Sequence, residues 1–247
     1  MQLLVSVADS REARAALAGG ADVIDAKDPL RGALGAVAPQ CLRAICDVVG
    51  PRRPVSAALG DAAHAARIGR AAHTAAEAGV TYVKVGFRGI GSSARVRHLA
   101  ASAADARVRL ILVAYADWAR ADGPPPAAVL EAATAVGAAG VLMDTAFKGA
   151  GLFDLVSRDT VAAWVAEARA AGLITALAGS LEGRDLLTAW EAGADIVGVR
   201  GAACLGGRTG CVSISRVAAL SAFADRAPLA RFGRDPAHRR ASPSHAP

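Results

Sequence analysis

Three lysines stand apart from the other basic residues of this 247-residue chain. Lysine and arginine together number 28, and the lysines are Lys27, Lys84 and Lys148. Each closes or follows a short apolar run of the kind that forms strands: VIDAK, TYVKV and VLMDTAFK. Arginine keeps its proton at neutral pH, whereas a buried lysine, or one beside another cation, can lose its proton and become a nucleophile. An arginine-rich composition explains why lysine is rare but not where these three lie, so their placement indicates amine chemistry.

Two aspartates accompany the lysines. Asp25 lies two residues before Lys27, and alternate residues of a strand share a face, so the two side chains point the same way. An isolated buried pair of this kind is equally consistent with a structural ion pair. The additional strand-end residues Lys84 and Asp144 favour catalysis, because converging ammonium groups repel one another and lower at least one pKa. The freed amine would attack a carbonyl group, and a nearby carboxylate would move protons.

Two glycine-rich segments in the last third of the chain, LAGSLEG and GVRGAACLGG, indicate a phosphate site. Gly179 and Ser180 would offer backbone N–H groups at the start of the following helix, where the helix dipole favours an anion. Arg200 and Gly201 would add a forked cation and open backbone beside them. The plainer alternative is that small residues only permit tight turns. A serine in one segment and an arginine in the next favour phosphate binding.

Short apolar runs alternate along the chain with alanine-rich helical stretches, and this alternation predicts how the residues are positioned. The expected strands are 3–7, 22–27, 54–59, 82–86, 109–116, 140–145, 174–179 and 196–201. The expected helices lie near 10–18, 39–49, 62–78, 92–105, 125–138, 159–171, 183–193 and 213–225. Eight strand–helix units predict an α/β fold, a single (β/α)8 TIM barrel, with its active site at the carboxyl ends of the strands.

An open doubly wound sheet is the alternative architecture. It usually has fewer strands and a glycine-rich first turn, whereas the first strand here runs into VADS without a GxGxxG motif. The barrel places Tyr115 and Asp117 at its mouth as well, at the end of the fifth strand. We therefore expect residues 1–225 to form one TIM-barrel catalytic domain.

Residues 226–247 are rich in arginine, proline and serine, and we expect them to form a disordered tail. The formal net charge of the chain is +6, and this segment supplies +4 of it through five arginines and one aspartate. The predicted barrel is therefore close to neutral. A uniformly basic face is not indicated, and we expect no nucleic-acid partner.

The four cysteines form no CxxC pair, and neither they nor the histidines have metal-ligand spacing, so we expect a reduced protein without a metal. The N-terminus does not have the pattern of a signal peptide, and no run reaches the roughly 18 apolar residues of a membrane helix. We therefore expect a cytoplasmic protein with no membrane attachment. Whether the alanine-rich outer helices pack against further copies in a homo-oligomer stays open.

Five segments of the chain resemble counterparts in one known family: VSVADSREARAALAGGADVIDAKDPLRGALGA, TYVKVGFRG, VLMDTAFKGAGLFD, LAGSL and DIVGVRGAAC. The D-x-K-[DN]-P and D-T-x-x-K-x-G elements are together the most specific. In these segments the chain is similar to the (5-formylfuran-3-yl)methyl phosphate synthases of methanofuran and methylofuran biosynthesis. The resemblance runs nearly colinearly from about residue 1 to residue 225.

The resemblance implies a lyase that condenses two molecules of glyceraldehyde 3-phosphate, releases one phosphate and two waters, and forms (5-formylfuran-3-yl)methyl phosphate. No metal or other cofactor is implied. Lys27 matches the Schiff-base lysine of the family, and Lys84 matches its second essential lysine, implicated in proton transfer. Asp25, Asp144 and Lys148 match its other active-site residues.

Two phosphorylated substrates also need two anion sites. The region of Ser180 and Arg200 is one candidate, and Lys148 with the loop after the sixth strand is a candidate for the second. The same lysines and loops would equally serve another class I Schiff-base aldolase or a sugar-phosphate isomerase. A barrel that only binds a phosphorylated metabolite is disfavoured, because arginine would suffice for binding.

Overall fold

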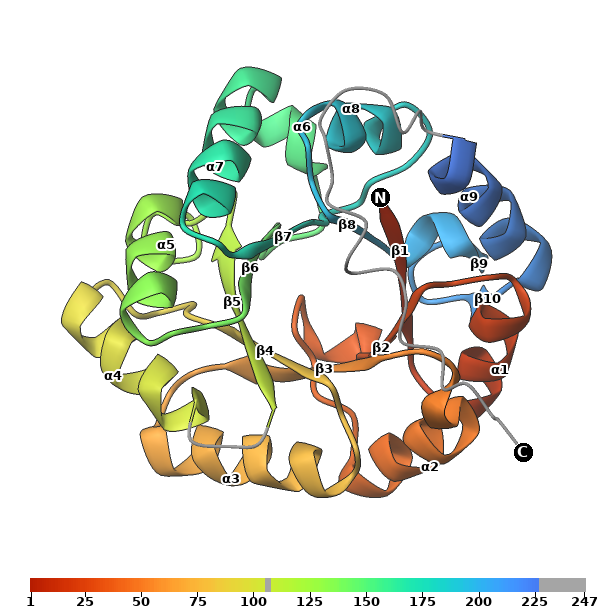
Figure 1. The fold of residues 1–247 in the computed structure, drawn as a ribbon, viewed down its shortest axis with the longest axis horizontal. Coiled ribbons are helices and arrows are strands. Elements are labelled where there is room, and N and C mark those ends of the chain that lie inside the picture. The colour runs from red at the N-terminus through yellow and green to blue at the C-terminus, as the bar shows by residue number, and fades with distance from the viewer. Residues whose placement is uncertain (105–107, 227–247) are drawn as a thin grey trace, which may run out of the picture.

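Eight parallel strands close into a barrel in sequence order, which confirms the predicted TIM-barrel fold. The computed structural model describes residues 1–104 and 108–226. The strands are β1 (Gln2–Val7), β2 (Val23–Ala26), β3 (Val55–Asp61), β4 (Tyr82–Gly86), β5 (Arg109–Tyr115), β6 (Gly140–Asp144), β7 (Ile174–Leu177) and β8 (Ile196–Val199). Figure 1 looks along the barrel and shows the helices as a ring around it. The predicted tail lies outside the described residues, except for Arg226, which ends the last helix.

One helix follows each strand near its predicted position, with additional short elements in the loops. The main helices are α1 (Ser10–Ala18), α2 (Pro39–Val49), α3 (Ala65–Glu77), α4 (Ser93–Ala104), α5 (Pro126–Ala135), α7 (Arg158–Ala170), α8 (Asp185–Glu191) and α9 (Ile214–Arg226). The short elements are η1 (Pro29–Arg31), η2 (Gly50–Arg52), α6 (Leu152–Leu155), η3 (Gly201–Ala203), β9 (Cys204–Leu205) and β10 (Cys211–Val212). The sequence did not predict these short elements, which lie in the loops around the strands.

Local chemistry explains where several helices begin and end. The Asp9 carboxylate accepts a hydrogen bond from the N–H of Glu12 at 2.8 Å and caps α1, and the Ser157 hydroxyl caps α7 through Thr160. Gly172 follows α7 with a φ of +76°, a left-handed conformation that costs glycine little and other residues more.

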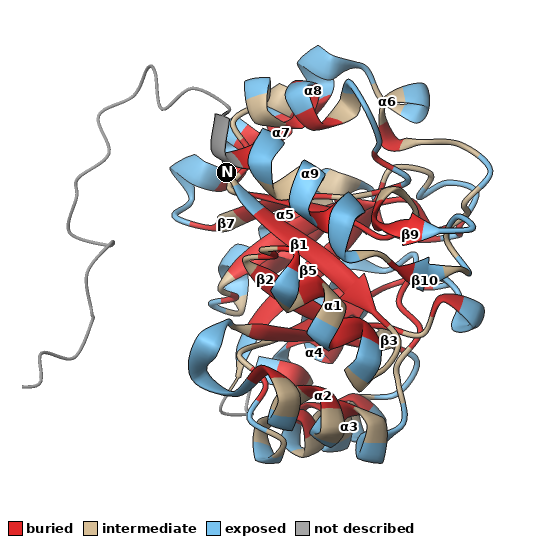
Figure 2. Cartoon of the chain, turned by 90° about the vertical axis from the view of Figure 1, so that its right-hand side faces the viewer, coloured by how far each residue is buried: buried red, intermediate tan, exposed pale blue. Residues whose placement is uncertain are grey.

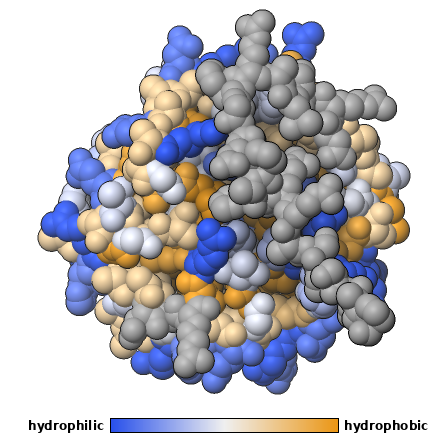
Figure 3. All heavy atoms as spheres, in the orientation of Figure 1, coloured by the Kyte–Doolittle hydropathy of each residue, from blue (hydrophilic) through white to orange (hydrophobic). Residues whose placement is uncertain are grey.

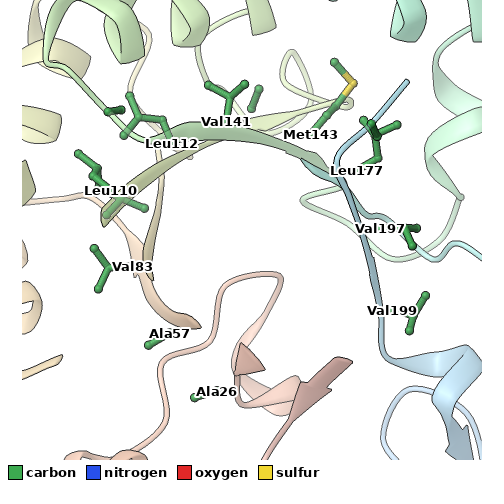
Figure 4. Close-up of a cluster of buried hydrophobic side chains, with 14 of the residues drawn as sticks. Ala26, Ala57, Val83, Leu110, Leu112, Val141, Met143, Leu177, Val197 and Val199 are labelled. Carbon is green, nitrogen blue, oxygen red and sulfur yellow. The ribbon is translucent and has the colours of Figure 1, made fainter. Parts of the chain in front are cut away.

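Two apolar layers stabilise the barrel. Side chains on the outer faces of the strands, such as Val83, Leu112 and Val141, pack against the helices (Figure 4). A second cluster, which includes Leu4 and Ile111, fills the inside of the barrel. Figure 2 shows the result: the strands are almost wholly buried, and the helices are exposed only on their outer faces. Removal of this apolar surface from water is the main force that holds the ring of helices against the sheet.

The two ends of the barrel differ. In Figure 2 the N-terminus lies at one end, and the hairpin of β9 and β10, which follows β8, lies at the other, where the strands have their carboxyl ends. Figure 3 views the opposite, amino-terminal face, where hydrophilic side chains gather along the rim and apolar ones lie nearer the centre of the part left uncovered. None of the described helices has both the length and the apolar character needed to cross a membrane.

Candidate active site

Lys27 directly follows β2 and continues its pairing, because its backbone N–H donates to the carbonyl of Val7 at 3.0 Å. The side chain is 7% exposed, and no described carboxylate oxygen lies within 4.0 Å of its Nζ atom. The pKa of this amine is lowered from 10.5 to about 8, mainly by burial; Lys84 contributes to the lowering, while Asp144 and Asp25 oppose it. Lys27 is therefore a buried amine that exists partly in its neutral, nucleophilic form near pH 8.

Asp25 is held by three side chains, two from the neighbouring strands β1 and β3 and one from β4. It is fully buried, and its carboxylate accepts from Lys84 Nζ at 2.6 Å, from Ser56 Oγ at 2.6 Å and from Ser6 Oγ at 2.8 Å. The strand register places Ser6 beside Asp25 and Asp25 beside Ser56, which puts all three in one layer. Burial raises the pKa of Asp25, but Lys84 and Lys27 with the hydrogen bonds outweigh it and hold the pKa below its ordinary value. Asp25 is thus a fixed anion that positions Lys84.

Asp144 and Lys148 form the second ion pair. Asp144 is 1% exposed, and its Oδ1 atom accepts from Lys148 Nζ at 2.7 Å and from the N–H of Thr145 at 2.7 Å. Burial raises the pKa of Asp144, but Lys148 and then Lys27 outweigh it and bring the pKa to about 2. The Lys148 amine also donates to the carbonyl and hydroxyl oxygens of Thr145, at 2.6 and 3.1 Å. Its three N–H groups are therefore all in use, which gives no support to Lys148 as a phosphate ligand.

One cavity of about 360 Å³ brings the five predicted catalytic residues together. They are Asp25, Lys27, Lys84, Asp144 and Lys148. Three ammonium groups and two carboxylates leave one positive charge in excess, and loss of the Lys27 proton makes the set neutral. Since an unpaired buried charge is unfavourable, the arrangement favours the neutral amine at Lys27 over the same form at the two ion-paired lysines.

The predicted phosphate segment after β7 lines the same cavity but does not begin a helix. Gly179 and Ser180 have left-handed backbones, with φ of +109° and +53°, and α8 starts only at Asp185. The expectation that these residues lie at a helix N-terminus is wrong, because the chain makes an additional turn after β7. Their backbone N–H groups donate no hydrogen bond to another described residue, so they remain able to bind an anion.

Arg200 is part of the protein framework in this structure rather than a free cation. Its Nε and two terminal nitrogens donate to both carboxylate oxygens of Glu12 and to the carbonyls of Ser6, Arg208 and Gly210, at 2.7 to 3.3 Å. A guanidinium has five N–H donors, and all five are engaged. The prediction that Arg200 binds phosphate is therefore corrected: it joins β8 to α1 and to the hairpin of β9 and β10.

Arg208 is a cavity-lining cation that the sequence analysis missed. It lies between β9 and β10 and donates to the carbonyls of Pro29 and Gly32, the latter at 2.7 Å, which ties the loop after β8 to the loop after β2. The N–H groups of Gly201 and Ala202, which also line the cavity, donate to no acceptor in the described part of the chain. The GGRTG segment was the available signal, because an arginine flanked by glycines suits a loop that approaches a ligand closely.

Tyr115 and Asp117 have different surroundings at the end of β5. The Tyr115 hydroxyl donates to Asp61 Oδ1 at 2.7 Å, and burial together with Asp61 raises the pKa of the tyrosine well above 10.0. Asp117 accepts from the backbone N–H groups of Ala146 and Phe147 at 2.7 and 2.9 Å. Both side chains therefore fix loops around the mouth. No group of three or more potential metal ligands occurs within residues 1–104 and 108–226.

The fold and the cavity define an α/β-barrel enzyme with buried lysine–aspartate pairs at the carboxyl ends of its strands. Phosphoribosyl anthranilate isomerase from Thermus thermophilus has the same fold, with a TM-score of 0.61 at 16% identity over 91% of this chain and 98% of that one. A 3-hexulose-6-phosphate synthase aligns with a TM-score of 0.57 at 18% identity, over 88% of this chain and 99% of that chain. At these identities the likeness extends to the fold alone.

Sequence comparison is more specific. The 4-HFC-P synthase family matches residues 3–221. The (5-formylfuran-3-yl)methyl phosphate synthase of Methanocaldococcus jannaschii is 41% identical over 215 residues, which is 84% of this chain and 92% of that protein. The synthase of Methanopyrus kandleri is 38% identical over 211 residues, or 82% of this chain and 89% of that protein. The chain belongs to the 4-HFC-P synthase family, which confirms the resemblance seen in its sequence.

Proposed function

We propose that this enzyme condenses two molecules of glyceraldehyde 3-phosphate through a Schiff base on Lys27 and forms (5-formylfuran-3-yl)methyl phosphate, a furan precursor of a methanofuran-type carrier. The observation that carries the proposal is the buried Lys27 amine, whose pKa is lowered to about 8 inside a cavity with two aspartate–lysine pairs. The relatives named for this product support the choice of product.

The first half of the reaction uses Lys27 and Lys84. The neutral Lys27 amine attacks the aldehyde carbon of one triose, and the Lys84 ammonium gives a proton to the carbinolamine oxygen, which leaves as water. This leaves an iminium cation on Lys27 and a neutral amine on Lys84. The neutral Lys84 then takes the proton from the carbon next to the iminium, which gives an enamine and restores its own charge. Asp25 holds Lys84 at 2.6 Å and stabilises the ammonium at both ends of this cycle.

The second half joins the two trioses. The enamine carbon attacks the aldehyde of the second molecule and regenerates the iminium. A hydroxyl of the second triose then attacks the iminium carbon to close the ring, one phosphate and one further water are eliminated, and the Lys27 amine leaves from the same carbon without hydrolysis, so that two waters are released in all. Lys148 keeps the Asp144 carboxylate ionised on the other side of the cavity. That anion stabilises the cationic iminium across the cavity from Asp25.

The phosphate of the imine-bound triose is proposed to lie between the loops after β7 and β8, a common phosphate site of such barrels. Support comes from four cavity-lining residues whose backbone N–H groups have no described acceptor: Gly179, Ser180, Gly201 and Ala202. Arg208 supplies the positive charge beside them. Arg200 acts indirectly: its donors are all engaged within the protein, and its Nε donates to the carbonyl of Arg208 at 2.7 Å.

Borohydride reduction in the presence of glyceraldehyde 3-phosphate tests this function. Peptide mass spectrometry should place the reduced adduct on Lys27, and the Lys27→Ala variant should trap none. Incubation of the unmodified enzyme with glyceraldehyde 3-phosphate alone should give a furan chromophore and free phosphate in equal amounts. An adduct on Lys84, or a sugar phosphate without a furan, would replace this proposal with a different Schiff-base aldolase or an isomerase.

A further inference from the structure

Two arginines converge on one aromatic ring at the side of the mouth formed by β4, β5 and β6. The guanidinium carbon of Arg88 lies 4.7 Å from the centroid of the Phe147 ring, and that of Arg120 lies 4.1 Å from it. Both distances lie within the range of cation–π contacts. The two guanidinium carbons are therefore no more than about 9 Å apart. One ring from a third loop thus holds two like charges together.

The loops that carry these residues are joined through their backbones. The N–H of Gly89, next to Arg88, donates to the carbonyl of Ala121, next to Arg120, at 3.1 Å. The Asp117 carboxylate accepts from the N–H of Phe147 at 2.9 Å and thereby fixes the ring relative to the Arg120 loop. These bonds fix the three loops relative to one another and bring the two arginines within reach of the ring.

Neither guanidinium forms an ion pair within the described side chains. No carboxylate oxygen of residues 1–104 and 108–224 lies within 4.0 Å of either guanidinium, although Asp61 accepts from the backbone N–H of Arg88, and neither side chain donates a hydrogen bond to a described residue. Arg200, in contrast, has all five donors engaged. Stacking occupies the face of a guanidinium and leaves its in-plane N–H groups available, the geometry that suits a phosphate.

The position of the pair matches a need of the reaction. Arg88 follows β4, Arg120 follows β5 and Phe147 follows β6, so all three lie at the carboxyl ends of strands. Figure 1 shows β4 to β6 on one side of the ring, across from β8 and its loop. Phe147 directly precedes Lys148, and a second cavity of about 450 Å³, beside the one that holds Lys27, is lined by Phe147, Arg120 and Asp117.

We propose that Arg88 and Arg120, held on the Phe147 ring, form a second anion subsite that binds the phosphate of the second triose phosphate. The assignment rests on the proposed condensation, which needs two phosphate-binding positions in one mouth. It replaces Lys148, whose donors are committed to Asp144 and Thr145. Guanidinium carbons no more than about 9 Å apart are close enough for one phosphate to accept N–H···O bonds from both.

The test uses Arg88→Ala, Arg120→Ala and the double variant, with Arg97→Ala as the matched control. Arg97 is an exposed arginine of α4 with no assigned role. The initial rate of furan formation is measured against glyceraldehyde 3-phosphate, and adduct formation on Lys27 is measured by borohydride trapping. Each single variant should raise the KM for furan formation about 10- to 100-fold, as expected for loss of a charged hydrogen bond, while the Lys27 adduct still forms. Arg97→Ala should behave like the unmodified enzyme.

Binding of inorganic phosphate, followed by calorimetry, separates this inference from the proposed function. The unmodified protein should bind two phosphates per chain. The double variant should bind one, beside Arg208, and the Arg208→Ala variant should bind one, at Arg88 and Arg120. Failure to trap an adduct would end the Schiff-base proposal and leave this stoichiometry intact. A double variant that keeps both phosphates and an unchanged substrate dependence would overturn the subsite. The subsite would also be overturned if the double variant changed only self-association, as measured by sedimentation velocity. The exposed Trp118 and Leu155 would then mark a contact between copies of the chain.

Discussion

Replacement of Lys27 by methionine should stabilise the protein while it abolishes activity. Methionine has nearly the length of lysine but carries no charge, so it fills the same space without the buried ammonium group. The Lys27 side chain is 7% exposed, and burial is the largest cause of its lowered pKa. The folded protein therefore carries an unfavourable charge at this position whenever the lysine is protonated.

The size of the effect follows from the pKa. A pKa that falls from 10.5 in the unfolded chain to about 8 in the folded protein corresponds to about 3 kcal/mol. Below pH 8 both states hold the proton, and the folded state carries the whole penalty. Between pH 8 and 10.5 the unfolded chain binds more protons than the folded one, so the free energy of unfolding rises with pH. Lys27→Met should thus be about 3 kcal/mol more stable near pH 7, and most of this difference should vanish by about pH 10.

Urea unfolding of both proteins at several pH values under reducing conditions measures this difference. Titrations of groups away from Lys27 are common to both and cancel, and Asp25 and Asp144, which Lys27 helps to keep ionised, titrate well below this pH range. Lys84→Met is the matched control with the opposite sign: it removes the 2.6 Å partner of Asp25 and should cost about 3–5 kcal/mol, the usual result of leaving one buried ion unpaired. A Lys27→Met protein no more stable than the parent near pH 7, or a difference that does not narrow as pH rises, would refute the account of a desolvated amine.

Three further outcomes are expected. The kcat/KM of the unmodified enzyme should rise with pH and level off above about 8, as the Lys27 amine loses its proton, which a pH–rate profile checks. Lys148→Met should raise the pKa of Asp144 from about 2 and lower the free energy of unfolding by up to about 2 kcal/mol near pH 7. The difference should fade as pH falls from 4 toward 2, because Asp144 then contributes little to stability in either protein. Unfolding measured over this acid range checks it. Glu12→Gln should cost about 3–5 kcal/mol in urea unfolding, because it leaves Arg200 buried without its anion; a cost under about 1 kcal/mol would mean that the pair is not desolvated.

The barrel and its catalytic layer could be predicted because both depend on short-range patterns. Alternation of strands and helices gives the fold, and the strand ends place Asp25, Lys27, Lys84 and Asp144 at one mouth. The hydrogen-bond and ion-pair partners of individual side chains could not be predicted in the same way. Arg200 reads as a free cation beside glycines, and only the fold shows that a glutamate 188 residues earlier takes its charge.

The conformations of the loops could not be predicted from the sequence for a related reason. Glycine-rich loops after β7 and β8 have many allowed conformations, so their composition predicted an anion site but not the left-handed backbones of Gly179 and Ser180. The ring that joins Arg88 and Arg120 comes from a third loop, and such a meeting depends on the position of three strands at once. Each residue alone has the appearance of an ordinary surface or packing residue.

The seam of the barrel has a consequence for the way the chain is made. β1 pairs with β2 on one side and with β8 on the other, so residues near Gln2 cannot complete their hydrogen bonds until Ile196 has been synthesised. The Glu12 carboxylate likewise lacks its ion-pair partner until Arg200 has been synthesised. A ribosome that has released the first four strands has supplied Ser6, Asp25, Ser56 and Lys84, yet β1 still has an open edge. Until β8 emerges, a nascent chain can pair with a neighbouring chain along that edge. Closure of the barrel removes this risk of aggregation and also buries the Glu12 carboxylate against Arg200.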